Sequence, residues 1–135
     1  MVRKSIRVSI DRSKSANYKL VAKNFNQGAK LASNHDYFNA AGVLMVHAAI
    51  AYADALTIKY VGAKSKGEDH HEVISLLEEV FPLNDDRRKS LNHLNAIIEH
   101  KNAVSYSGDV YDKKDIDQLW KHLERFKSWA ITLLK

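Results

Sequence analysis

Residues 40–60, AAGVLMVHAAIAYADALTIKY, decide the fold of this chain. Between residues 40 and 56, only His47 and Asp54 are strongly polar. The many Ala, Leu and Met residues and the absence of Pro favour a helix. Its apolar residues lie on all sides, so we expect other helices to surround it. The stretch is slightly short for a bilayer, and an internal His and Asp argue further against a membrane span.

The two polar residues of this helix, His47 and Asp54, are candidate supporting residues of a functional site. They are seven residues apart, so they lie on nearly one face, separated by about 10 Å along the axis. Either one can instead be a buried polar group that a neighbouring helix satisfies. A buried carboxylate needs a cation or several donors beside it, so another helix is expected to bring a positive charge to Asp54.

Length and composition describe an ordinary single globular domain. The chain has 135 residues, of which 45% are hydrophobic and 27% are charged. Five Gly and one Pro leave little material for turns, which predicts long helices with few connections. The absence of Cys excludes disulfides, thiolate metal sites and Cys nucleophiles. We expect a basic N-terminal arm at residues 1–14 and one helical-bundle domain at residues 15–135.

The N-terminal arm carries much of the net charge of +5, which permits a polyanionic partner without requiring one. Its alternating residues VRKSIRVSI allow either a solvated arm or a short strand. The arm lacks the apolar core of a signal peptide, so a cytoplasmic location is expected. Five basic residues face a single acidic residue, Asp11: Arg3, Lys4, Arg7, Arg12 and Lys14.

Helical spacing continues on both sides of residues 40–60. A first helix over about residues 15–33 has a predicted apolar face made of Tyr18, Val21, Phe25, Ala29 and Ala32. After the basic connection at residues 62–67, Asp69 and Glu72 have the spacing of a capping box for a short helix that ends at Pro82. His70 and His71 are adjacent and point about 100° apart on a helix, so no metal site and no cofactor are expected there.

Two further helices complete the expected fold. Asn84 caps a fourth helix that continues towards Gly108, and Asp112 with Asp115 forms the capping box of the last one. The predicted fold class is therefore all-α, an up-and-down bundle of about five helices, four long and one short. Alanines 41, 48 and 55 recur every seven residues and are expected to form a small-residue face for a homodimer.

Lys101 is the anomaly on the fourth helix, because it falls within about 40° of both Leu94 and Ile97 in the apolar stripe. A lysine in that position either extends to the surface or pairs with a buried group, and Asp54 is the candidate partner. Asn102 and Tyr106 lie about 40° apart on the neighbouring face. A purely structural Lys–Asp bridge, with Asn102 and Tyr106 closing the helix end, is one explanation.

From about Tyr18 onward the chain resembles the HEPN domain family. The resemblance rests on the alanine-rich second helix, on KSKGEDHHEVISLLEEVF and on IIEHKNAVSYSGDVYDKKDIDQLWKHLERFKSWAITLL. Members typically carry Arg, then a polar residue that is often Asn, then His, near the end of the fourth helix. Many bacterial members have Asp-Tyr at the end of that motif. Lys101 here takes the place of the Arg and Tyr106 that of the His.

The resemblance implies a homodimer in which the motifs of two protomers face one cleft. Members with intact Arg and His are commonly metal-independent endoribonucleases, whereas others are partners of nucleotidyltransferases in toxin–antitoxin pairs or bind nucleotides and RNA. Lys offers phosphate a point charge and not a bidentate fork, and a phenol with a pKa of about 10 is a poor base at pH 7. Both departures leave phosphate binding possible and weaken catalysis.

These observations give a leading hypothesis and two alternatives. The leading one is a cytoplasmic, prokaryotic HEPN-like protein that binds nucleotide or RNA phosphate through Lys101, Asn102 and Tyr106, with a nucleotidyltransferase as a partner and no membrane association. No catalytic residue is assigned. The first alternative is a metal-independent endoribonuclease toxin. The second is a structural or adaptor bundle with no nucleic-acid role.

Overall fold

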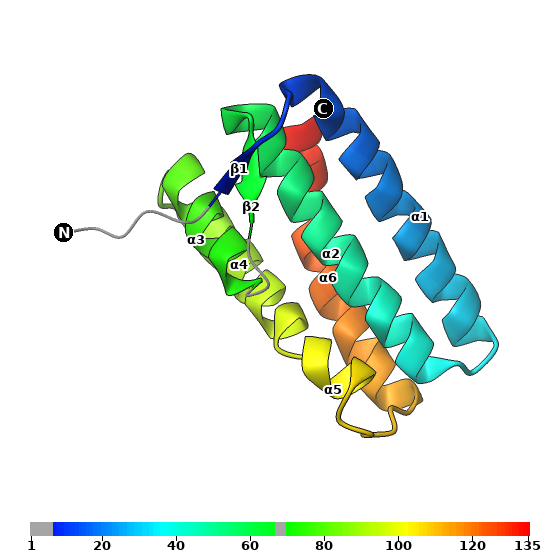
Figure 1. Cartoon of the computed structure of the whole chain (residues 1–135). Coiled ribbons are helices and arrows are strands. Elements are labelled where there is room, and N and C mark those ends of the chain that lie inside the picture. Colours follow the sequence, from blue (N-terminus) through cyan, green and yellow to red (C-terminus); the bar gives the residue numbers. More distant parts are fainter. Residues whose placement is uncertain (1–6, 67–69) are drawn as a thin grey trace.

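Four long helices and two short ones make up the bundle in a computed structural model, which describes residues 7–66 and 70–135 (Figure 1). The long helices are α1 (Ser15–Asn34), α2 (Phe38–Val61), α4 (Asp85–Ile98) and α6 (Lys113–Leu134). The short ones are α3 (His71–Val80) and α5 (Lys101–Ser105), and a turn of 3₁₀ helix, η1 (Arg12–Lys14), precedes α1. The predicted all-α helical bundle is confirmed.

The central helix α2 is the core of the bundle, as its sequence predicts. Fourteen of its 24 residues are buried, including Tyr52 and Leu56. Helices α1 and α6 pack along it, and α3, α4 and α5 cover the remaining sides. By length and composition alone α2 could cross a membrane, but 78% of its most apolar 18-residue window is buried inside the bundle. Such burial is typical of the core helix of a soluble protein.

Small residues on α1 and α2 allow these two helices to pack closely. Ala41, Ala48 and Ala55 are fully buried within one chain, so they cannot form the face of a homodimer, and that prediction is wrong. On α1 the buried positions include Ala22 and Ala29, whereas Val21, predicted on the apolar face, is exposed. The buried stripe of α1 is rotated towards its smallest side chains because these permit the nearest approach to α2.

The alternating N-terminal residues form a short strand. Strand β1 (Arg7–Ser9) pairs antiparallel with β2 (Ala63–Ser65), and Arg7 lies opposite Ser65. Gly62 ends α2 with φ +65, a left-handed conformation in which Gly is unstrained, and its N–H donates to Ile58 O. Arg7 also forms an ion pair with Glu79 near the end of α3. Residues 7–9 are thus held against the bundle.

Two predicted helix caps are confirmed, whereas the expected cap of α2 by Asn34 or Asp36 is wrong, because Tyr37 is its N-cap and no side chain caps it. Asn84 Oδ1 accepts a hydrogen bond from Arg87 N at 2.8 Å at the start of α4. At the start of α6, Asp112 and Asp115 form a complete capping box, with N···O distances of 2.9 and 3.0 Å. The box predicted at Asp69 lies outside the described residues.

The expected fourth helix is broken just before the motif. Helix α4 ends at Ile98, and α5 begins at Lys101 after a tightened turn in which His100 N donates to Ile97 O. The break turns Val104 onto the start of α2, where a Cβ added to Gly42 would lie 2.8 Å from Val104 Cγ1. Lys101 consequently does not continue the buried stripe of Leu94 and Ile97, and it is only half-buried.

The contact between Gly42 and Val104 gives the first testable prediction. Gly42→Ala should lower the melting temperature, because overpacking costs about 1–3 kcal/mol and exceeds the gain of about 1 kcal/mol in helix propensity. In a Val104→Ala background the same change should be neutral or stabilising. Thermal unfolding followed by circular dichroism completes this double-mutant cycle. Equal effects of Gly42→Ala in both backgrounds would contradict the packing described here.

Candidate functional site

The three motif residues gather on or just after α5, at the end of the bundle where α6 begins (Figure 1). Asn102 and Tyr106 are exposed, and 81% of Tyr106 is accessible to solvent. Lys101 is half-buried. Within residues 7–66 and 70–135, none of the three side chains takes part in a hydrogen bond or an ion pair of the chain. Their polar groups are therefore available to a ligand.

The backbone around α5 is fixed by Asn39, a residue that the sequence analysis did not single out. Asn39 Nδ2 donates to Val104 O at 3.0 Å and to Asp109 O at 2.9 Å, while its Oδ1 accepts from Tyr111 N at 2.9 Å. One carboxamide at the start of α2 thus holds α5 and the segment that leads into α6. The only signal in the sequence that could have identified this role was the presence of an Asn in the first turn of the long apolar helix.

His100, which directly precedes Lys101, is engaged in the structure of the site. Its Nδ1 lies 2.6 Å from the Tyr111 hydroxyl, and the two rings meet edge to face at 5.7 Å. Burial, followed by the charges of Asp115 and Asp109, raises the pKa of Tyr111. Nδ1 and the phenol hydroxyl thus form a hydrogen bond whose donor depends on the His100 tautomer, so this nitrogen is not a free general base.

Asp54 lies away from the motif, and the predicted pair with Lys101 is not made within the chain. Helix α5 contacts α2 near Gly42, about 18 Å along the axis from Asp54. Asp54 is buried, its Oδ1 has no hydrogen-bond partner, and burial raises its pKa to about 7. The positive charge that acts on it comes from Lys64 in β2 and not from another helix.

His47 is not buried with Asp54, contrary to the expectation for a shared polar face. Its side chain is exposed, and its ring lies 5.6 Å from that of Phe25 on α1. Asp54 differs in that it lies next to Ala55, whose carbonyl accepts from Ser15 Oγ, and in that Lys64 of β2 acts on it. Neither residue contributes to the surface formed by Lys101, Asn102 and Tyr106.

A pair of histidines, His93 and His122, joins α4 to α6. His93 Nδ1 and His122 Nδ1 are 3.0 Å apart, so one ring donates to the other. Burial is the main cause that lowers the pKa of both histidines. The next cause is the charge of His122 in the case of His93, and the charge of His100 in the case of His122. The charge of Arg125 lowers both pKa values further. The sequence offered no signal for this pair, because the two residues are 29 positions apart. In the described ranges no group of three or more His, Cys, Asp or Glu is arranged to hold a metal ion.

Comparisons with protein-family models, curated proteins and solved structures found no match to this chain. The site is therefore defined by its own geometry. It consists of an ammonium group, a carboxamide and an exposed phenol on a short helix, fixed by Asn39 and by the contact of Val104 with Gly42. Such groups bind anions and the polar edges of planar ligands.

Asp54 gives a prediction about stability and pH. Its folded-state pKa of about 7 exceeds the ordinary aspartate value of 3.8, so the folded state retains a proton that the unfolded state releases between these pH values. The free energy of unfolding therefore falls as pH rises from about 4 to 7, by up to about 4 kcal/mol from this group. Asp54→Asn should remove this loss.

Melting temperatures measured from pH 4 to pH 8 provide the test. The advantage of Asp54→Asn over the unsubstituted protein should grow as pH rises, whereas the exposed control Asp86→Asn should show no such growth. An advantage that does not change with pH would mean that Asp54 is ionised throughout.

The histidine pair predicts the opposite dependence at lower pH. Because the folded-state pKa values of His93 and His122 are lowered, the unfolded state gains protons first as pH falls below about 6.5. The pair therefore causes a loss of stability on acidification. His122→Gln should reduce the loss between pH 6.5 and 5 in chemical denaturation, whereas the exposed control His47→Gln should not.

Proposed function

We propose that this protein is a HEPN-like nucleotide- or RNA-binding protein that binds phosphate through Lys101, Asn102 and Tyr106 with little or no cleavage. The observation that carries the proposal is the state of these side chains. They stand together on a short, fixed helix at the surface and make no internal hydrogen bond or ion pair within the described residues. A half-buried cation beside an exposed amide and an exposed aromatic ring suits a nucleotide.

The chemistry of the three groups supports binding over catalysis. Lys101 supplies a positive charge for a phosphate, Asn102 supplies two donors and an acceptor, and Tyr106 supplies a ring face and a hydroxyl. Cleavage through the RNA 2′-hydroxyl needs a base that works near neutral pH. A phenol is not such a base, and His100 Nδ1 is already bonded to Tyr111.

The same proposal includes the wider arrangement that the family resemblance implies. The protein would act in the cytoplasm as a homodimer and as one half of a module with a nucleotidyltransferase partner. Its dimer surface would use other residues than Ala41, Ala48 and Ala55, because these are buried within one chain.

The test measures binding of a fluorescein-labelled single-stranded RNA by anisotropy. Affinity should fall with rising salt, because bound cations displace counterions from phosphate. Lys101→Ala should weaken binding most, Asn102→Ala less, and Tyr106→Phe modestly. Lys89→Ala is the matched control, since it removes one exposed lysine from α4, about 13 Å along the helix axis before its end at Ile98. An equal loss in Lys89→Ala would indicate diffuse electrostatic binding and no site.

Cleavage assays without metal separate the remaining alternatives. Lys101→Arg with Tyr106→His restores the catalytic pair of the family and should create or raise RNA cleavage. If the unsubstituted protein cuts RNA efficiently and Tyr106→Phe abolishes cutting, the protein is a ribonuclease and the binding proposal is wrong. If it binds neither RNA nor nucleotide even at low salt, the adaptor alternative holds.

A further inference from the structure

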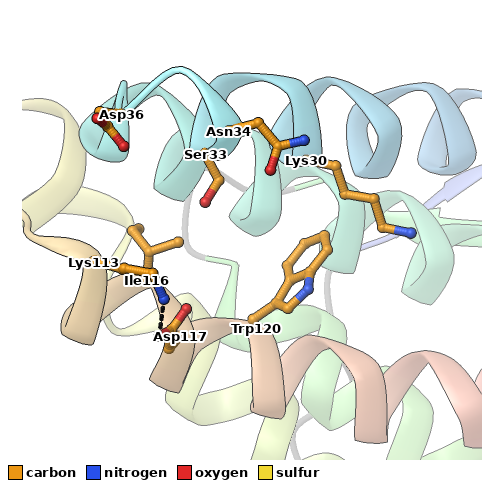
Figure 2. A pocket seen from close by; sticks show the side chains of 8 residues that line it. All are labelled: Lys30, Ser33, Asn34, Asp36, Lys113, Ile116, Asp117 and Trp120. Atoms are coloured by element: carbon orange, nitrogen blue, oxygen red, sulfur yellow. Dashed lines mark hydrogen bonds and ion pairs between the residues drawn. The ribbon is translucent and has the colours of Figure 1, made fainter.

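A cavity of about 400 Å³ lies between the end of α1 and the start of α6 (Figure 2). Its volume is in the range of about 300–1,000 Å³ typical of small-molecule sites. Ile116 lines the cavity and also lies beside the contact of Gly42 with Val104, since its Cδ1 is 3.5 Å from the position of a Gly42 Cβ. The cavity and α5 are therefore at the same end of the bundle.

An aromatic wall is the first chemical feature of the cavity. Trp120 is half-buried and reaches from α6 towards α1 (Figure 2). The Lys30 ammonium group lies 6.0 Å from the centre of its ring, at the limit of a cation–π contact. This contact is weak at a surface, so Lys30 can turn to a ligand anion and leave the indole face to a planar group.

The second feature is a carboxylate without a counter-charge. Lys113 Nζ is 2.9 Å from Asp117 Oδ2, so these two lining charges neutralise each other. Asp36 lines the same cavity, and its carboxylate has no ion pair or side-chain hydrogen bond within residues 7–66 and 70–135. Its backbone is fixed at φ 64, a left-handed conformation, with its N–H donating to Ser33 O at 3.0 Å.

Trp120, Asp36 and Lys30 together define one ligand chemistry. The ligand needs a flat ring for Trp120, a hydrogen-bond donor edge for Asp36 and an anionic group for Lys30. Figure 2 places Asp36 towards one end of the cavity and Lys30 towards the other, with Trp120 between them. Ser33 and Asn34 add further polar groups along the α1 wall. A nucleotide combines a stacking ring, amino or imino N–H groups and a phosphate.

We propose that this cavity binds one nucleotide, with its base stacked on Trp120, its donor edge facing Asp36 and its phosphate beside Lys30. The proposal rests on the proposed function and extends it to a base-binding subsite at the same end of the bundle. The nucleotide is a free nucleoside monophosphate or one unit of a single strand that continues to Lys101. These two sources share their chemistry and are separated by the test.

Fluorescence of Trp120 is the direct readout. The chain contains two Trp residues, and Trp129 packs against Phe81 and Phe126. In a Trp129→Phe background Trp120 is therefore the only Trp reporter. AMP, GMP and a single-stranded RNA 12-mer are titrated separately. Saturable quenching by AMP or GMP supports a site for free nucleotide, whereas quenching by the 12-mer alone supports a subsite for a strand.

Substitutions then test each contact. Trp120→Leu should weaken binding by about 5- to 150-fold, the range of one base–aromatic stack, whereas Trp120→Phe should retain most of the affinity. Asp36→Asn keeps the left-handed backbone, which Asn tolerates, and should shift the preference between AMP and GMP. Lys30→Gln should weaken binding of the nucleotides more than of adenosine. Lys23→Gln, which changes an exposed lysine of α1, is the charge-matched control.

The outcomes separate this inference from the proposed function. If Lys101→Ala weakens RNA binding while Trp120→Leu, Asp36→Asn and Lys30→Gln leave it unchanged, and Trp120 is not quenched, the subsite is refuted and the proposed function stands. If Trp120 is quenched but Lys101→Ala has no effect, the subsite stands and the motif site fails. Loss of folding in Trp120→Leu leaves the test to Asp36→Asn and Lys30→Gln, whose side chains are exposed. No binding of any probe overturns both.

Discussion

Close packing around α2 is the constraint on which the rest of the bundle depends. Alanines make up much of its buried surface, so the backbones of neighbouring helices can approach it, while Tyr52 and Leu56 fill the remaining space. At one end Asn39 holds the segment that leads into α6. At the other, Lys59 Nζ and Tyr60 Oη each donate to Leu133 O, a carbonyl near the end of α6. Helix α2 therefore fixes α6 at both ends through polar groups just outside its apolar centre.

Both candidate binding features follow from this arrangement at the Asn39 end. Because α5 is separate from α4, it can turn Val104 onto Gly42 and leave Lys101, Asn102 and Tyr106 towards the solvent. On the other side of Ile116, α1 and α6 leave a cavity between Trp120 and Asp36. The bundle thus presents Lys101 with the exposed ring of Tyr106 on one side. On the other side it presents the indole of Trp120 with the carboxylate of Asp36. Rigid packing beneath each of them reduces the ordering that a ligand would have to impose.

The sequence was informative where local rules decide the outcome. Apolar composition on all sides identified α2, and the hydrogen-bonding residues Asn84, Asp112 and Asp115 located two helix starts. It misled where a helical pattern continues through a break, because the spacing of Lys101 with Leu94 and Ile97 gave no sign that α4 ends at Ile98. It also gave no sign of which long-range partners would meet. Asn39 with Tyr111, His93 with His122, and Asp54 with Lys64 are joined by tertiary packing, and helical periodicity carries no information about such pairs.

The small β-sheet affects more than the position of the N-terminal segment. Pairing of β1 with β2 brings together residues that are about 55 positions apart, and β2 carries the Lys64 charge that acts on Asp54. Lys64 is the cation that acts on the Asp54 carboxyl, so the sheet holds near this buried group a positive charge that favours its ionised form. The position of a three-residue strand and the charge of a side chain inside the bundle are in this way linked.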